Sequence, residues 1–158
     1  MPHPALAIAN KVIDSARLRG ISLTNMQLIK LIYIAHGWSL ALLNKALVSE
    51  QPQAWQHGPV YPSVYHEFRE SGSRPVSEKA SNPFSGTAWD ADLSVDEQSV
   101  IDQVVQAYGE FHAFSLSART HQQGTPWFQI WDNGRGKYRP IPNDLIKGHF
   151  TELNARNS

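Results

Sequence analysis

Seven histidines are the residues of this chain with the widest chemical repertoire, and their spacing limits what they can do. A zinc site on a helix needs two ligands about four residues apart, completed by a carboxylate or a third histidine. Here His57 and His66 stand nine positions apart, as do His112 and His121, and the chain contains no HExxH pattern. The sequence therefore predicts no metal ligands, and nothing in it indicates a cofactor.

His36 stands among apolar residues of a predicted helix, which makes it the most informative of the seven. A buried imidazole must find a hydrogen-bond partner. We expect a core histidine satisfied by a backbone carbonyl or a hydroxyl; the alternative is a functional imidazole whose pKa is shifted by burial. In a later predicted helix, Phe111, Phe114 and Ala118 are expected to form the apolar face, because they recur at helical spacing. His121, at the end of this face, is the second candidate for a buried polar site.

The patterns of nucleophilic and phosphate-binding enzymes are absent from the sequence. It has no GxSxG, GxxxxGK(S/T) or GxGxxG motif, and Ser115 and Ser117 fall inside a predicted helix. The absence of cysteine excludes disulfides, thiolate metal sites and thiol nucleophiles. We expect a protein that is not an enzyme. The alternative is an uncharacterised enzyme in which His36, His57 and His121 converge in one pocket.

The only basic cluster consists of Arg135, Lys137 and Arg139, interleaved with Gly136 and Tyr138. Alternating basic and aromatic side chains can hold phosphates and stack a base, so a nucleic-acid-binding protein is a further alternative. The chain has 14 Lys and Arg against 14 Asp and Glu, which gives a formal net charge of zero. Because nucleic-acid binders usually carry a broad basic face, we expect no nucleic-acid partner.

The chain shows neither a signal-peptide pattern nor a predicted membrane span. Its first four residues lack the basic start and apolar run of a signal peptide. The most apolar stretch, residues 28–43, is interrupted by Lys30 and His36 and is shorter than the roughly 20 residues that a span needs. We therefore expect a cytoplasmic protein without a membrane partner.

The segment from Trp55 to Tyr65 combines aromatic rings, an imidazole and prolines in one predicted turn and helix start. Such side chains provide a large contact area at low entropic cost, as interface anchors do. We predict a partner-binding surface here. The alternative is that these rings only cover the core. The candidate contact residues are Trp55, His57, Pro59, Tyr61 and Tyr65.

The elements that position these residues are mainly α-helical. A central apolar helix is predicted over Asn25–Leu43, because Thr24 and Gln27 form a capping box in front of it. Only a narrow face of this helix, with Gln27, Lys30 and Gly37, is expected to be polar. Shorter helices are predicted near residues 4–19, 63–70, 94–108, 111–121, 125–131 and 141–153. The only β element expected is a short edge strand around Leu47–Val48, and 73–92 reads as a surface loop. The prediction is thus one compact domain over 1–158, with six or seven short helices around the central one.

Three blocks of the sequence make a family resemblance visible. They are Leu28–Trp38, Ala54–Phe68, and Leu116-Ser117 through Thr120-His121 to Gly124–Trp127. In this order they resemble the Panacea domain, a phage-associated antitoxin family also called SocA-like or GepA-like, over roughly Ala5 to Leu153.

The resemblance implies an antitoxin of a bacterial or prophage toxin–antitoxin system. Its partner would be a cognate toxin encoded by a neighbouring gene, which most members of the family bind directly. The SocA type acts instead as a proteolytic adaptor that delivers its toxin to the ClpXP protease, so ClpXP is a further candidate partner. The family supplies no catalytic residues to carry over to this chain.

Overall fold

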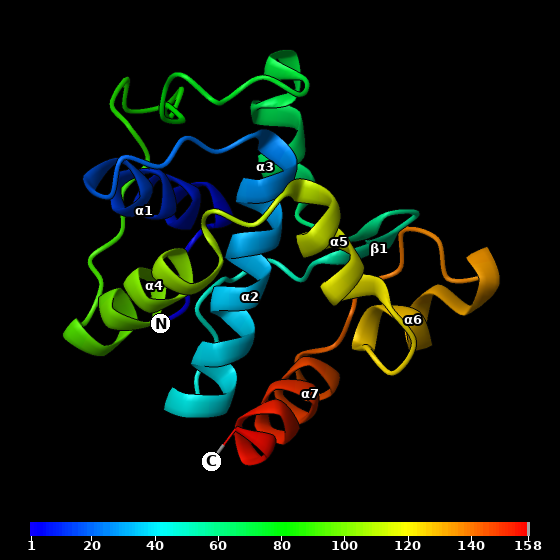
Figure 1. Cartoon of the computed structure of the whole chain (residues 1–158). Coiled ribbons are helices and arrows are strands. Elements are labelled where there is room, and N and C mark those ends of the chain that lie inside the picture. Colours follow the sequence, from blue (N-terminus) through cyan, green and yellow to red (C-terminus); the bar gives the residue numbers. More distant parts are fainter. Residues whose placement is uncertain (158) are drawn as a thin grey trace.

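Helix α2 (Asn25–Leu43) runs through the middle of the fold and packs against five other helices (Figure 1). The structure, a computed structural model, describes residues 1–157, and within them lie seven α-helices and one two-stranded antiparallel sheet. The predicted mainly α architecture around a central apolar helix is therefore confirmed. The helices in contact with α2 are α1 (Ala5–Leu18), α3 (Pro62–Glu67), α4 (Val95–Tyr108), α5 (Ala113–His121) and α7 (Asn143–Arg156).

Capping boxes fix the starts of α2 and α4. Thr24 Oγ1 accepts the Gln27 amide, and Gln27 Oε1 accepts the Thr24 amide in return. Ser94 and Glu97 do the same at α4. Each box satisfies amides that a helix start leaves without partners, so the sequence located both starts correctly.

By length and composition alone α2 is apolar enough to cross a membrane. In this structure, however, 67% of its most apolar window is buried inside the fold. That burial is typical of the core helix of a globular protein.

Close packing of α7 on α2 depends on Gly37. A Cβ at this position would lie 2.2 Å from the ring of Phe150. That ring packs edge-on against Tyr33 and Trp38, with centroid separations of 6.1 and 5.3 Å. Gly37 therefore allows an aromatic side chain of α7 to reach the backbone of α2.

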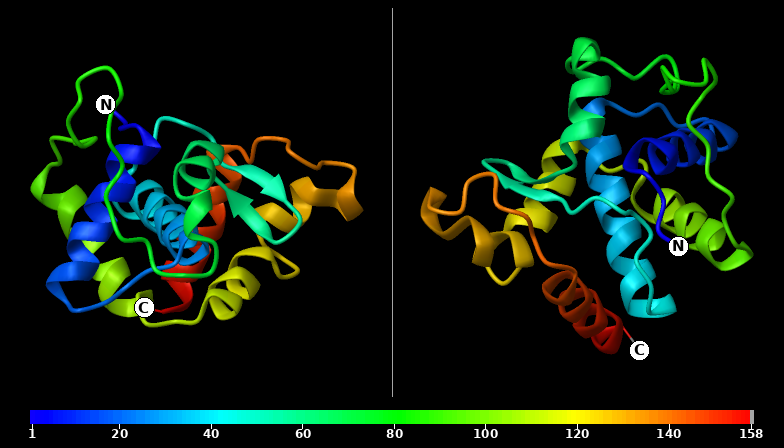
Figure 2. Two further views of the ribbon diagram at one scale, coloured as in Figure 1. Left: turned by 90° about the horizontal axis from the view of Figure 1, so that it is seen from above. Right: turned by 180° about the vertical axis from the view of Figure 1, so that it is seen from behind.

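A β-hairpin stands on the side of α2 away from α1 and α4 (Figure 2). Strands β1 (Gln53–Trp55) and β2 (Gly58–Val60) pair in the register Gln53↔Val60 and Trp55↔Gly58. Only two residues, Gln56 and His57, connect them. Helix α6 (Pro126–Trp131) contacts β1, and α2 and α5 contact β2. The 3₁₀ helix η1 (Arg69–Ser71) follows α3, and the 3₁₀ helix η2 (Asp132–Gly134) follows α6.

The predicted strand at Leu47–Val48 is wrong. Val48 forms only an isolated bridge with His3, and both apolar side chains are buried in the core. Their hydrophobicity reflects packing. Strand β2 lies in the segment predicted as a turn and a helix start, and β1 ends at Trp55, where that segment begins.

Residues 73–94 contain no helix or strand. The buried side chain of Asn10 holds this segment, because its Nδ2 donates to the carbonyls of Ala80 and Trp89 and its Oδ1 accepts the Ala80 amide. One side chain of α1 thus ties the segment to the core, in addition to the isolated bridges Thr24↔Pro75 and Ser81↔Ala88.

Candidate partner-binding surface

The hairpin is held by three side chains from three different helices. Trp127 Nε1 of α6 donates to the Trp55 carbonyl at 2.6 Å, and Ser117 Oγ of α5 donates to the His57 carbonyl at 2.5 Å. Lys30 Nζ of α2 donates to the Pro59 carbonyl at 2.7 Å. Side chains of three helices thus satisfy alternate carbonyls of the hairpin and hold it against the helical core.

The third of these donors is the unexpected one. Lys30 lies on the face of α2 expected to be polar, yet its side chain is fully buried. Burial lowers the pKa of Lys30 from 10.5 to about 7. The amine therefore serves as a hydrogen-bond donor inside the fold and is hidden from any partner.

Of the predicted contact residues in and beside the hairpin, some lie at the surface and others lie in the core. Trp55 and Tyr65 are half-buried and pack edge-to-face at 5.0 Å, and His57 is exposed at the turn. Pro59 and Tyr61 are buried, and burial raises the pKa of the Tyr61 hydroxyl. Trp55, His57 and Tyr65 are thus within reach of a partner, whereas Pro59 and Tyr61 support them from inside.

A groove of about 740 Å³ lies beside the hairpin turn. The side chains of His57, His112, Phe114, Ser117 and His121 contribute to its lining, together with residues at the start of α2. Phe114 is 83% exposed and stacks on the His112 ring at 5.9 Å. A large aromatic side chain exposed at the edge of a groove is typical of an interaction surface.

The sequence missed Phe114 because it assigned the wrong buried face to α5. Phe114 and Ala118 were expected to point into the core, but both are exposed, and Leu116, Ser117 and Thr120 are buried instead. Packing against β2 and α2 orients the helix so that Ser117 reaches the hairpin. Such an orientation depends on tertiary contacts that helical periodicity does not encode.

His36 and His121, the candidates for a buried polar site, share no hydrogen-bond partner. His36 is buried, its Nδ1 accepts the Val48 amide at 3.2 Å, and its Nε2 therefore donates to Asn143 Oδ1 at 2.9 Å. A backbone amide and a side-chain amide oxygen thus satisfy His36, instead of the backbone carbonyl or hydroxyl that we expected. Burial lowers the pKa of His36, and the Asn143 hydrogen bond opposes this effect.

His121 is half-buried and lies in the groove with His57. Its Nδ1 is 3.1 Å from Ser117 Oγ, and its ring packs on Trp127 at 5.3 Å. The Ser117 hydroxyl gives its proton to the His57 carbonyl, so His121 Nδ1 must act as the donor in their contact. The pair is therefore arranged as a structural link, since a general base would have to accept the serine proton.

Among residues 1–157, no group of three or more His, Asp or Glu side chains is arranged to hold a metal ion. The three imidazoles of the groove are thus brought to one surface without forming a ligand set.

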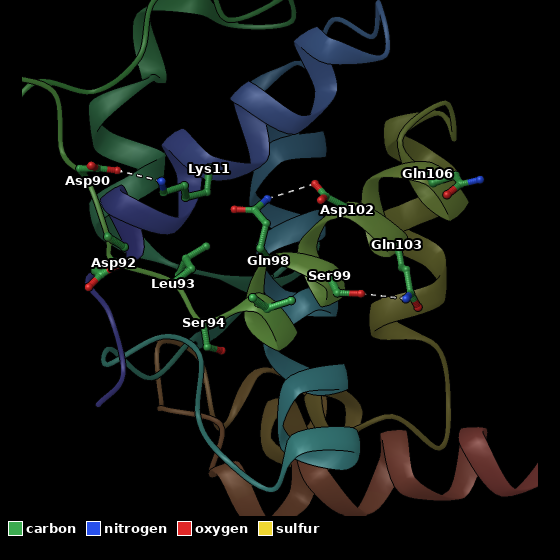
Figure 3. Close-up of a pocket in the computed structure, with 12 residues that line it drawn as sticks. Lys11, Asp90, Asp92, Leu93, Ser94, Gln98, Ser99, Asp102, Gln103 and Gln106 are labelled. Carbon is green, nitrogen blue, oxygen red and sulfur yellow. Dashed lines mark hydrogen bonds and ion pairs between the residues drawn. The ribbon is translucent and has the colours of Figure 1, made fainter.

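A second depression, of about 880 Å³, lies along the outer side of α4 (Figure 3). Its polar side chains point toward one another: Lys11 pairs with Asp90 at 3.0 Å, and Gln98 donates to Asp102 at 3.1 Å. The Lys11 contact lowers the pKa of Asp90, and both groups remain partly exposed. None of the predicted site residues lies here, and the depression reads as a solvated helix face.

Comparison with known proteins adds two findings. Residues 28–128, which run from α2 to α6 and include the hairpin, match the sequence model of the family described as "Antitoxin SocA-like, Panacea domain". Antitoxin SocA from Caulobacter vibrioides (strain NA1000 / CB15N) is 33% identical over 138 residues, which cover 84% of this chain and 72% of that protein. No solved structure matches the chain.

Proposed function

The chain belongs to the SocA-like antitoxin family with the Panacea domain, and from this membership we propose that it neutralises a toxin encoded by a neighbouring gene by binding it directly. The observation that carries the proposal is the 33% identity to antitoxin SocA over most of both chains. The encounter would take place in the cytoplasm.

The geometry supports a binding protein with a prepared surface. Trp55 and Tyr65 offer aromatic contact area, and Phe114 stands exposed at the groove beside His57. The three side-chain bonds to the hairpin carbonyls hold this region in place. Preorganisation of this kind lowers the entropic cost of association.

The chemistry of the polar side chains supports the same proposal over the enzyme alternative. His36 is occupied by Val48 and Asn143, and the Ser117 proton is committed to a backbone carbonyl. His36 does not line the groove that contains His57 and His121, so the three imidazoles do not share one pocket. A catalytic nucleophile or base would need a free lone pair aimed at bound substrate.

Co-expression with the neighbouring gene product tests the function. We expect that product to stop growth when expressed alone, growth to return when this chain is co-expressed, and the two proteins to co-purify. A neighbour that is harmless alone and forms no complex would refute the proposal.

The fate of the toxin separates direct inhibition from proteolytic delivery. For direct inhibition we expect the toxin to persist at a constant level in the complex. If the toxin is instead lost faster in the presence of this chain, and only in cells with ClpXP, the chain acts as an adaptor.

Phe114→Asp tests the contact surface. Both Phe114 and Val95 are more than four-fifths exposed in the first turn of a helix, where a carboxylate is favourable, so neither Phe114→Asp nor the control Val95→Asp should unfold the protein. Loss of a central aromatic anchor costs about 2 kcal/mol, or roughly a 30-fold loss of affinity. We expect this loss of toxin affinity for Phe114→Asp alone, measured by calorimetry. Equal affinities of the two variants would exclude the groove from the interface.

A further inference from the structure

The segment Arg135–Arg139, called the strap below, lies along the free edge of the hairpin. The Tyr138 amide donates to the Ala54 carbonyl at 2.7 Å, and the Ala54 amide donates to the Arg139 carbonyl at 2.9 Å. Pro140 forms an antiparallel bridge with Gln53. The strap thus extends the sheet by one short stretch of backbone and covers the edge of β1.

The backbone of the strap adopts conformations that most residues avoid. Tyr138 has a φ of 69°, in the left-handed region, which is unusual for a bulky side chain. A Cβ on Gly136 would lie 1.7 Å from the Ile130 carbonyl oxygen, so only glycine fits there. Strain of this kind persists where the surrounding structure holds it, often at functional positions.

The strained conformation places the Tyr138 ring at the surface. The ring packs edge-on against Trp55 at 5.6 Å, and Trp55 in turn packs on Tyr65. Tyr138 remains 54% exposed, and Lys137 Nζ lies 5.1 Å from its centroid. Three aromatic rings and a cation are therefore presented together.

The charges of the strap are not balanced locally. Arg135 pairs with exposed Asp132 at 3.3 Å, but within residues 1–157 neither Lys137 nor Arg139 forms an ion pair with a carboxylate. Residues 80–118, by contrast, contain six Asp and Glu and no Lys or Arg. The formal net charge of zero therefore conceals a separation of charge along the chain.

We propose that the strap, together with Trp55 and Tyr65, grips an acidic segment of the toxin that carries an apolar or aromatic side chain. Lys137 and Arg139 would pair with its carboxylates, and the exposed rings would receive the apolar group. Complementary charge would also steer the encounter. This inference rests on the proposed function and names the chemistry of the partner segment.

Two variants test it against the purified neighbouring gene product. Tyr138→Gly removes the ring and relieves the positive φ, so we expect an unchanged or higher thermal midpoint together with at least a tenfold loss of affinity. The double variant Lys137→Gln/Arg139→Gln should weaken binding and reduce its dependence on salt. Arg17→Gln/Lys45→Gln, an equal change of charge at exposed positions outside the strap, is the matched control and should bind normally.

The outcomes separate this inference from the proposed function. If the wild-type chain binds the neighbour and both strap variants bind equally well, the strap is not the contact and the antitoxin function stands. If the wild-type chain fails to bind, the proposed function fails and this inference with it. If the strap variants still bind the toxin but no longer bind a single-stranded oligonucleotide that the wild-type chain binds, the strap is a nucleic-acid contact and not the toxin contact. If the strap variants still bind the toxin but no longer self-associate at low salt as the wild-type chain does, the strap contacts a second copy of the chain and not the toxin.

Discussion

Replacing Lys30 with methionine should stabilise the protein at pH 7 and leave its stability nearly unchanged at pH 9. The Lys30 side chain is fully buried, donates to the Pro59 carbonyl, and forms no ion pair within residues 1–157. Burial in this uncompensated site disfavours the ammonium and lowers the pKa of Lys30 from 10.5 to about 7.

The size of the effect follows from proton uptake on unfolding. In the unfolded chain the pKa of lysine stays near 10.4, so between pH 7 and 10 the unfolded state binds a proton that the folded state largely lacks. At 1.36 kcal/mol per pH unit this favours unfolding by about 4 kcal/mol at pH 7 and about 2 kcal/mol at pH 9. Stability therefore rises with pH across this window and is lost as the pH falls toward 7.

Methionine fills a similar volume and does not titrate. It leaves the Pro59 carbonyl without its donor, which costs about 1–3 kcal/mol. The expected net gain for Lys30→Met is therefore about 1–3 kcal/mol at pH 7 and about zero at pH 9.

Urea unfolding at pH 7, 8 and 9 measures this difference, with Lys45→Met, an exposed position, as the control. The series ends at pH 9 because burial raises the pKa of Tyr33 and Tyr61, and tyrosines of the unfolded chain begin to lose protons near pH 10. At about 2–4 °C per kcal/mol, the thermal midpoint at pH 7 should rise by several degrees. A Lys30→Met effect of equal size at pH 7 and pH 9 would show that the buried lysine keeps its charge and would refute the reasoning.

Two further substitutions probe the core. His36→Leu leaves a buried backbone amide without its acceptor, so we expect a loss of about 2 kcal/mol at pH 7 with toxin affinity retained; a folded variant that no longer binds toxin would make His36 functional. Because the pKa of His36 is lowered from 6.5, the unfolded wild-type chain gains an extra proton below pH 6.5, and its stability should fall by up to about 1.4 kcal/mol per pH unit more steeply than that of the variant. Gly37→Ala forces a methyl group against the Phe150 ring and should cost about 1–3 kcal/mol in urea unfolding; an unchanged midpoint would mean that α7 does not pack on α2 as described.

Local signals in the sequence predicted most of the fold. The pairs Thr24/Gln27 and Ser94/Glu97 located two helix starts, and the apolar run 28–43 identified the central helix. These features depend on neighbours three or four residues apart, which the sequence shows directly.

Strand pairing and helix orientation depend on contacts between distant segments, and the sequence pattern did not predict them. Strands of three residues are too short for an alternating pattern, so the hairpin at 53–60 was missed. Exposed Phe114 was assigned to the core, because the buried face of α5 is set by its contact with the hairpin. Lys30 was assigned to a polar face, since nothing in a helical pattern reveals that its amine meets the Pro59 carbonyl.

The same contacts divide the residues of the candidate surface into two groups. One group holds the hairpin in place, and the other is proposed to contact the partner. Lys30, Ser117 and Trp127, which hold the hairpin, all lie within residues 28–128, the range that matches the family model. The strap at 135–139 begins after this range ends. We infer that the matched range supplies a rigid hairpin, whereas the charges and the ring placed along its edge determine which toxin segment can bind. On this view, a change at Lys30 alters stability and a change at Tyr138 alters partner affinity, although both side chains act on the same hairpin.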